Sequence, residues 1–252
     1  MAKILAMTNR KGGSGKTSAS VNIAAEFAAR GQRVLLIDLD TQSHCAIGLG
    51  IAIARDAPTI HGFMEGKNTL SQAICPSQWP RLELIPGNPL ADHGTGKYSE
   101  THLRDALCLP EIHACYDWIV LDTAPSLDTL LINALRAADR VLVPFVPHYL
   151  GAEGVRQLSR LLFRIVSNGN NDKLNLLGFL PVMQDTRVGL HREMILSLSQ
   201  QFGEERLLPG VRNDIRVAEA FAVGQPLRVF APKCRAASDY AEVVDKMCLL
   251  WR

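Results

Sequence analysis

The chain has 252 residues, of which 47% are hydrophobic and 21% are charged, and its formal net charge is +2. These proportions exclude a disordered chain and are typical of a protein with one substantial core. The small net charge neither demands nor excludes a nucleic-acid partner, so any basic surface has to be local. The six cysteines form no C-x-x-C pair and show no zinc-like spacing with histidine. Because the first predicted strand follows Met1 almost at once and no apolar run could span a bilayer, we expect a cytoplasmic protein with reduced, mostly buried thiols.

The most informative stretch is residues 9–18, with the sequence NRKGGSGKTS. It follows the apolar run 4–7, a predicted strand, and precedes the alanine-rich segment 19–29, a predicted helix. A glycine-rich turn in this setting lets consecutive N–H groups point into one concavity, and the helix N-terminus adds its positive end. In such a loop Lys16 reaches the β- and γ-phosphates and the Thr17 hydroxyl ligates Mg²⁺. The sequence therefore predicts an ATP site made by Lys11, Gly12, Gly13, Ser14, Gly15, Lys16, Thr17 and Ser18.

Acidic residues follow two further predicted strands. The apolar run 33–37 ends at Asp38 and Asp40, and the run 116–121 ends at Asp122. In a doubly wound parallel sheet, ligands bind beyond the carboxyl ends of the strands, so these acids are expected beside the phosphate loop. An apolar strand with a terminal aspartate is the Walker B arrangement, in which Asp122 holds Mg²⁺ through water.

The remaining segments continue the alternation of strands and helices. We predict strands at 82–86, 140–144 and 176–182, helices at 58–66, 70–74, 153–167 and 187–202, and an exposed loop at 94–99. This alternation favours an α/β P-loop NTPase fold with a mainly parallel twisted sheet flanked by helices. No linker divides the chain, so residues 1–252 are expected to form one domain.

The string Lys-Gly-Gly-x-Gly-Lys-Thr resembles the deviant Walker A motif of the ParA/MinD family of ATPases. Arg10 stands where the usual phosphate-loop pattern has its first glycine, and Lys11 matches the signature lysine of the family. The resemblance covers nearly the whole chain and includes Asp38-x-Asp40-x-Gln42, residues 116–125, Asp185-x-Arg187 and residues 215–220. It is closest to the short ParA-type members that lack an N-terminal helix-turn-helix domain.

This resemblance implies a slow ATPase that uses ATP and Mg²⁺ and forms an ATP-sandwich homodimer. Lys16 would serve the nucleotide of its own subunit, and Lys11 would cross to the phosphates of the partner. Asp40 matches the residue that orients the attacking water, so the catalytic set is Lys11, Lys16 and Asp40, with Thr17, Asp38 and Asp122 around the metal. Gly12 lies where the two backbones would approach, and a β-carbon there should obstruct closure.

The resemblance also implies that the ATP dimer binds double-stranded DNA nonspecifically through Arg187 and Arg216. The window 206–235 supports this, because it holds six basic residues against two acids. A cargo-linked ParB-like or adaptor protein would stimulate hydrolysis on the nucleoid, and the cargo would be a plasmid or chromosome partition complex or a protein organelle such as a carboxysome. Met183 and Arg212 are expected near the adenine, although Gly210-Val211-Arg212 replaces the Ile-Pro-Arg that is usual in the family.

Two other functions share the phosphate loop. A MinD-like membrane-cycling ATPase needs a basic amphipathic C-terminal helix. Residues 240–252 are mostly apolar with few cations, so we expect this helix to pack on the core and membrane binding to be unlikely. A nitrogenase-like reductase needs cysteines that bridge an iron–sulfur cluster between subunits. Neither Cys108 nor Cys115 has the glycine-flanked setting of that family.

Overall fold

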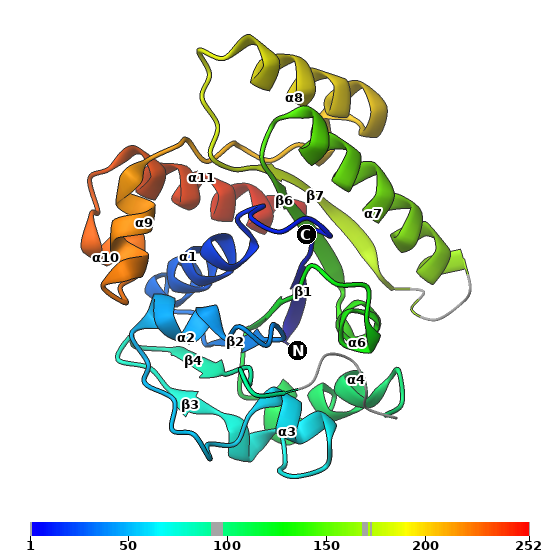
Figure 1. The fold of residues 1–252 in the computed structure, drawn as a ribbon, viewed down its shortest axis with the longest axis vertical. Helices are drawn as coiled ribbons and strands as arrows, with labels where there is room; N and C mark the ends of the chain where they lie inside the picture. The colour runs from blue at the N-terminus through cyan, green and yellow to red at the C-terminus, as the bar shows by residue number, and fades with distance from the viewer. Residues whose placement is uncertain (1, 92–97, 168–170, 172, 252) are drawn as a thin grey trace.

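Seven strands form one sheet in the order β3-β4-β2-β5-β1-β6-β7 (Figure 1). The computed structural model describes residues 2–91, 98–167, 171 and 173–251, without the side chains of 150–153, 156, 164, 166 and 167. Neighbouring strands are parallel except for the short edge strand β3, which is antiparallel to β4. The strands are β1 (Lys3–Met7), β2 (Val34–Asp38), β3 (Cys75–Pro76), β4 (Leu82–Ile85), β5 (Trp118–Asp122), β6 (Arg140–Phe145) and β7 (Asn175–Pro181).

Helices cover both faces of this sheet. On one face lie α1 (Lys16–Ala29), α2 (His44–Leu49), α9 (Ile215–Ala222), α10 (Leu227–Phe230) and α11 (Arg235–Leu250). On the other lie α3 (Ile60–Met64), α4 (His102–Leu107), α5 (Pro110–His113), α6 (Thr129–Ala137), α7 (Tyr149–Ser167) and α8 (Gly189–Phe202). Two short 3-10 helices, η1 (Ser71–Ala73) and η2 (Glu204–Arg206), complete the described elements.

The alternation of side chains along each strand divides the core into two clusters. In β1, Leu5 and Met7 pack toward α1 and α11, whereas Ile4 and Ala6 pack toward α6 and α7. Both faces of the central strands are therefore buried, which explains why the sequence shows continuous apolar runs there rather than alternating ones. The predicted α/β fold with a mainly parallel sheet is confirmed.

The strand register brings three distant parts of the chain to one edge of the sheet. Met7, the last residue of β1, pairs with Asp122, and Asp122 pairs in turn with Asp38. The phosphate loop leaves β1 at this same edge. The acids and the loop are thus neighbours because three parallel strands end together, as expected from their positions after apolar runs.

Some boundaries and exposures differ from the sequence-based expectations. The helix predicted from residue 187 begins at Gly189, and the helix predicted at 70–74 is the 3-10 turn η1. The expectation of mostly buried cysteines is wrong, because Cys45 alone among the six is buried and Cys108 and Cys115 are exposed. Both exposed thiols lie in short connections, Cys108 between α4 and α5 and Cys115 between α5 and β5. Residues 92–97 of the predicted loop 94–99 lie outside the described residues.

Candidate nucleotide-binding site

The loop between β1 and α1 has the conformation of an anion cradle. Gly13 and Gly15 adopt left-handed backbone conformations, with φ of 68° and 77°, which favour glycine over other residues. Gly15 precedes α1, and no side chain caps the first N–H groups of that helix. Within the described residues, the buried Ser14 Oγ also has no hydrogen-bond partner. Uncapped donors and an orphaned hydroxyl at a helix N-terminus fit a bound phosphate group.

The two lysines of the loop have different environments. Lys16 is buried, and its Nζ donates to the carbonyl oxygen of Lys11 at 3.4 Å. Burial lowers the pKa of Lys16, while the charges of Asp122 and Asp40 act in the opposite direction. Lys11 is less buried, and its Nζ lies 3.3 Å from Nε2 of His148, in the connection between β6 and α7. Lys16 therefore lies in the interior of the cradle, and Lys11 lies at its rim.

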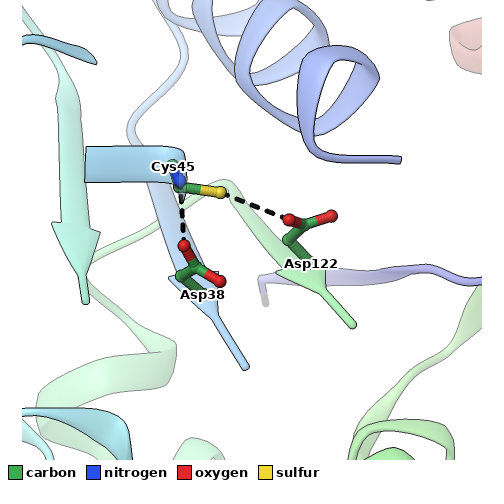
Figure 2. A group of neighbouring side chains, drawn as sticks. All are labelled: Asp38, Cys45 and Asp122. Carbon is green, nitrogen blue, oxygen red and sulfur yellow. Dashed lines mark hydrogen bonds between the residues drawn. The ribbon is translucent and has the colours of Figure 1, made fainter. Parts of the chain in front are cut away.

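Two fully buried carboxylates, Asp38 and Asp122, each accept a hydrogen bond from Cys45 (Figure 2). Asp122 accepts hydrogen bonds from Ser20 Oγ at 2.8 Å and from Cys45 Sγ at 3.4 Å, and Thr17 also bonds to it through its side chain. Asp38 accepts from the backbone N–H groups of Asp40 and Cys45, at 3.0 and 2.9 Å. One ligand atom each from Asp38, Cys45 and Asp122 lies within 4.8 Å of the others.

Burial raises the pKa of both carboxyl groups, and the charge of Asp122 raises the pKa of Asp38 further. Two like charges held together in the interior destabilise the chain unless a cation or a proton compensates them. Oxygen ligands of this kind, together with the Thr17 hydroxyl, suit Mg²⁺. The residues present therefore fit the divalent cation that the sequence predicts.

Asp40 stands nearer the surface, at the mouth of the site. Its Oδ1 accepts the backbone N–H of Gln42 at 3.0 Å, and the residue is half-buried. Gly87, which follows β4, packs directly on this segment, since a β-carbon at Gly87 would lie 2.2 Å from the carbonyl oxygen of Asp40. The position of Asp40 thus depends on the strand next to its own.

A cavity of about 250 Å³ opens beside the N-terminus of α1. Gly15 and Ser18 form its inner wall, and both predicted adenine-proximal residues, Met183 and Arg212, line it as well. Arg212 is fixed by a fork of hydrogen bonds to the buried Asp239, with Nη2 to Oδ1 at 2.6 Å. The remaining lining residues are Val182, Val211, Asn213, Asp214, Ile215, Val217, Ala218 and Tyr240. An apolar cavity next to a phosphate cradle has the composition expected for a base pocket.

The two predicted DNA-binding arginines are exposed on different elements. The Arg187 side chain is 89% exposed and pairs with Asp185 at 2.8 Å, just before α8. The Arg216 side chain is 55% exposed and pairs with Glu219 at 2.9 Å on α9. Arg187 also lines a hollow of about 280 Å³ together with Arg212 and Arg235.

The basic surplus predicted for residues 206–235 is smaller than the local count suggests. Arg212 and Arg228 are paired with the buried carboxylates of Asp239 and Glu26, which lie outside that window in the sequence. Including these two acids lowers the surplus from four charges to two. Arg206 is also turned inward, where it donates to the carbonyl oxygen of Leu176. The basic surface is therefore carried by fewer side chains than the sequence count indicated.

The chain is similar to known proteins over nearly its whole length. Residues 2–176 match a family model described as "AAA domain". The chain is 32% identical over 250 residues to the "Chromosome partitioning protein ParA" of Caulobacter vibrioides, covering 97% of this chain and 93% of that protein. The chain belongs to the ParA family. A second relative in the family, the "Chromosome-partitioning ATPase Soj" of Thermus thermophilus, is 34% identical over 245 residues, covering 96% of this chain and 94% of the relative.

Solved structures share the fold of this ParA-family chain over its whole length. The Cyanothece apo McdA structure has a TM-score of 0.87 at 19% identity, covering 98% of this chain and all of that one. The cobyrinic acid a,c-diamide synthase of Mycobacterium smegmatis, solved with an ATP analogue and magnesium, has a TM-score of 0.81 at 28% identity, covering 100% of this chain and 96% of that one. The expected membership of the ParA/MinD ATPases and the P-loop fold are confirmed.

Several residues of the site carry no signal in the sequence. Cys45, Ser20 and Asp239 reach the site only because the fold brings them there, from 77, 102 and 27 positions away from their partners. His148 contacts Lys11 across 137 positions. Motif spacing detects residues on one loop or at one strand end, and these contacts join separate elements.

Proposed function

We propose that this chain is a ParA-type ATPase whose ATP-bound form is a homodimer that binds DNA nonspecifically and positions a cargo. The contrast between the two loop lysines carries this proposal. Lys16 is buried inside its own cradle and bonds to the loop backbone, whereas Lys11 stands at the rim with its Nζ beside His148. In this proposal, the rim cation reaches a nucleotide held by a second copy.

ATP is bound, in this proposal, by the loop residues 11–18, with the adenine in the cavity next to Met183 and Arg212. Lys16 compensates the charge of the β- and γ-phosphates, and Asp40 orients the attacking water. Thr17 would ligate Mg²⁺, with Asp38 and Asp122 holding it through water. When bound, the metal neutralises charge on the phosphates. Asp38 and Asp122 end two neighbouring strands at the carboxyl edge of the sheet, and Lys16 and Thr17 begin α1 next to it.

Gly12 supports the dimer. It is exposed, its φ is not in the left-handed region, and a β-carbon there would meet no atom within 4 Å. The fold of the single chain therefore gives no reason for glycine at this position, unlike at Gly13 and Gly15. A second copy approaching the loop would supply that reason, because it needs the space that a β-carbon would fill.

The exposed arginines support nonspecific DNA binding. Surface ion pairs such as Arg187–Asp185 and Arg216–Glu219 contribute little stability, so phosphate groups can compete for both guanidinium groups at small cost. Dimerisation doubles the number of contacts, and each contact with the DNA backbone releases counterions. DNA binding of this kind depends on the phosphate charges and not on the base sequence.

The names of relatives as chromosome-partitioning proteins support the biological setting proposed here. In the cytoplasm, ATP-bound dimers would reside on the nucleoid, and a ParB-like or adaptor protein linked to the cargo would stimulate an otherwise slow hydrolysis. The cargo would be a plasmid or chromosome partition complex, or a protein organelle such as a carboxysome. Hydrolysis then releases the dimer, so that ATP acts as a timer.

A MinD-like membrane cycle is the second candidate, and α11 argues against it. This helix buries Tyr240, Val243, Val244 and Met247 in the core beside α1, so its apolar face is already occupied. Such a cycle needs binding at the membrane surface and not a spanning helix; the described residues contain no helix long and apolar enough to cross a bilayer. A pelleting assay with ATP and either DNA or anionic liposomes distinguishes the two functions. Recovery with liposomes and not with DNA would favour the membrane cycle.

The decisive experiment is the oligomeric state with a nonhydrolysable ATP analogue and Mg²⁺. We expect the wild-type chain to become a dimer by multi-angle light scattering and to remain a monomer with ADP. Asp40→Ala should form the same dimer with ATP itself, because it loses the group that orients water, and its turnover should fall about a hundredfold or more. Lys16→Ala is the control that should bind no nucleotide. A wild-type chain that stays monomeric with the analogue would overturn the proposal.

A further inference from the structure

The rim lysine is held by a residue that belongs to none of the recognised motifs. Lys11 Nζ and His148 Nε2 are 3.3 Å apart. A lysine ammonium can only donate hydrogen bonds, so Nε2 must be the acceptor and the ring proton must lie on Nδ1. The contact therefore requires a neutral imidazole in one defined tautomer.

The backbone of Lys11 is fixed to the same region of the fold. Asn9 donates from Nδ2 to the carbonyl oxygen of Pro144 in β6, at 2.8 Å, and its Oδ1 accepts the N–H of Lys11 at 3.0 Å. Gly154 of α7 lies against this bridge, since a β-carbon there would be 3.2 Å from Asn9 Oδ1 and 3.9 Å from Cβ of Lys11. The backbone of Lys11 is thus tied through Asn9 to β6, and its side chain contacts His148 in the connection between β6 and α7.

The surroundings keep His148 neutral. Burial lowers the pKa of His148 and the positive charge of Lys11 lowers it further, while a backbone hydrogen bond acts in the opposite direction. His191 on α8 also lowers the pKa of His148, and its own Nδ1 accepts the backbone N–H of Asp185. A neutral ring at physiological pH is the form that accepts a hydrogen bond from Lys11.

We propose that His148 is a positioning residue that holds Lys11 in its own subunit, and that this contact is given up when Lys11 reaches the nucleotide of a second copy. The inference rests on the proposed crossing of Lys11. Dimer formation would break two such contacts, one in each subunit, so His148 sets the protein concentration at which ATP produces dimers.

The substitution His148→Phe tests this, because it removes the acceptor and keeps a planar ring. A partly exposed hydrogen bond to a charged group is worth roughly a factor of three to ten in an equilibrium constant. With two contacts per dimer, the midpoint of dimerisation with a nonhydrolysable ATP analogue and Mg²⁺ should fall roughly ten- to a hundredfold. His148→Gln retains an acceptor and should stay near the wild-type midpoint. His113→Phe, on α5, is the matched control for the ring exchange.

The effect of pH provides a readout that a merely structural role would not change. Protonated His148 cannot accept a hydrogen bond and repels Lys11. The wild-type dimer should therefore form at lower protein concentration as pH falls below about 6.5, the ordinary pKa of histidine. His148→Phe should lack this component. In the nucleotide-free monomer, Lys11→Met should raise the pKa of His148 measured by NMR, because it removes the neighbouring positive charge.

The outcomes separate this inference from the proposed function. A wild-type chain that never dimerises with the analogue overturns both. If the wild-type chain dimerises normally and His148→Phe leaves the dimerisation midpoint unchanged or raises it, the inference alone is overturned. The control for this outcome is that monomeric His148→Phe binds a fluorescent ATP analogue as the wild type does. An unchanged pKa of His148 in Lys11→Met overturns it as well.

Discussion

At the scale of single residues, the site is made from groups whose burial opposes folding. Asp38 and Asp122 are completely buried side by side, and Lys16 is buried above them. Neighbouring groups offset the cost of burying these charges only in part, because burial is the largest influence on the pKa of all three groups. Binding of a phosphate and a cation would relieve this imbalance, so the free energy given up in folding is recovered when the ligands bind.

Asp122→Asn should stabilise the nucleotide-free and metal-free chain. Among the described residues, the hydrogen bonds to the Asp122 carboxylate come from the hydroxyls of Ser20 and Thr17 and the thiol of Cys45, and a hydroxyl can also accept from the amide of an asparagine. The substitution removes one of two buried like charges and should raise the unfolding free energy at pH 7 by about 1–2 kcal/mol. Thermal unfolding should shift upward by about 2–8 °C, while hydrolysis of ATP with Mg²⁺ should be lost.

The pH dependence of the unfolding free energy tests this expectation for Asp122→Asn. Because the folded-state pKa of Asp122 is raised, the folded chain binds the proton more tightly than the unfolded chain. Wild-type stability therefore falls as pH rises from about 4 through the folded-state pKa, and Asn at this position removes that loss. The two proteins should converge below about pH 4. Asp105→Asn, on the surface of α4, should show no such gain, and a less stable Asp122→Asn would contradict the argument.

How far the sequence predicts these residues depends on the kind of contact. Asp38, Asp40 and Asp122 were predictable because each follows an apolar run, and parallel strands end at one edge of the sheet. Cys45 and His148 were not, because a thiol or an imidazole near a site is recognisable only once α2 and the connection after β6 have been placed. The ion pairs of Arg212 with Asp239 and of Arg228 with Glu26 were missed for the same reason.

At the scale of elements, the central strands were predicted well and the segments between them less well. Continuous apolar runs such as residues 119–121 identify a strand buried on both faces, whereas α4, α5 and α9 are short and only partly covered. Their helical form depends on tertiary packing rather than on intrinsic propensity. The segment after β4 also shapes the site, because Gly87 packs against the backbone of Asp40.

Gly87→Ala should disturb catalysis through the neighbouring strand. The added β-carbon would lie 2.2 Å from the carbonyl oxygen of Asp40 and 3.4 Å from that of Asp38, and backbone atoms cannot move aside as a flexible side chain can. We expect a loss of about 1–3 kcal/mol in stability, typical of overpacking, and at least a tenfold lower turnover. Thermal unfolding and phosphate release measure the two effects. Gly189→Ala, where a β-carbon meets nothing within 4 Å, is the control. Wild-type turnover in Gly87→Ala would show that Asp40 tolerates the displacement.

At the scale of the whole molecule, the distribution of charge matters more than its total. A net charge of +2 predicts no particular partner, and several arginines are committed to internal contacts. The exposed guanidinium groups of Arg187 and Arg216 remain available near the face that carries the nucleotide site, since the loop before α8 and the start of α9 flank the cavity lined by Met183 and Ile215. Nucleotide-dependent dimerisation would therefore bring four such groups to one assembly.

Charge reversal at these two positions should separate DNA binding from dimerisation. Arg187→Glu and Arg216→Glu should each leave the dimer formed with the ATP analogue intact, because both side chains form only local surface ion pairs. Retention on nonspecific DNA at physiological salt should drop at least tenfold, since two contacts per dimer are replaced by repulsion. For the wild type, the logarithm of affinity should fall linearly with the logarithm of salt concentration. Each lost phosphate contact should reduce that slope by roughly 0.9. Arg104→Glu removes a comparable surface pair with Asp105 on α4 and should keep the wild-type slope. Equal DNA retention by all four proteins would exclude these arginines from the DNA contact.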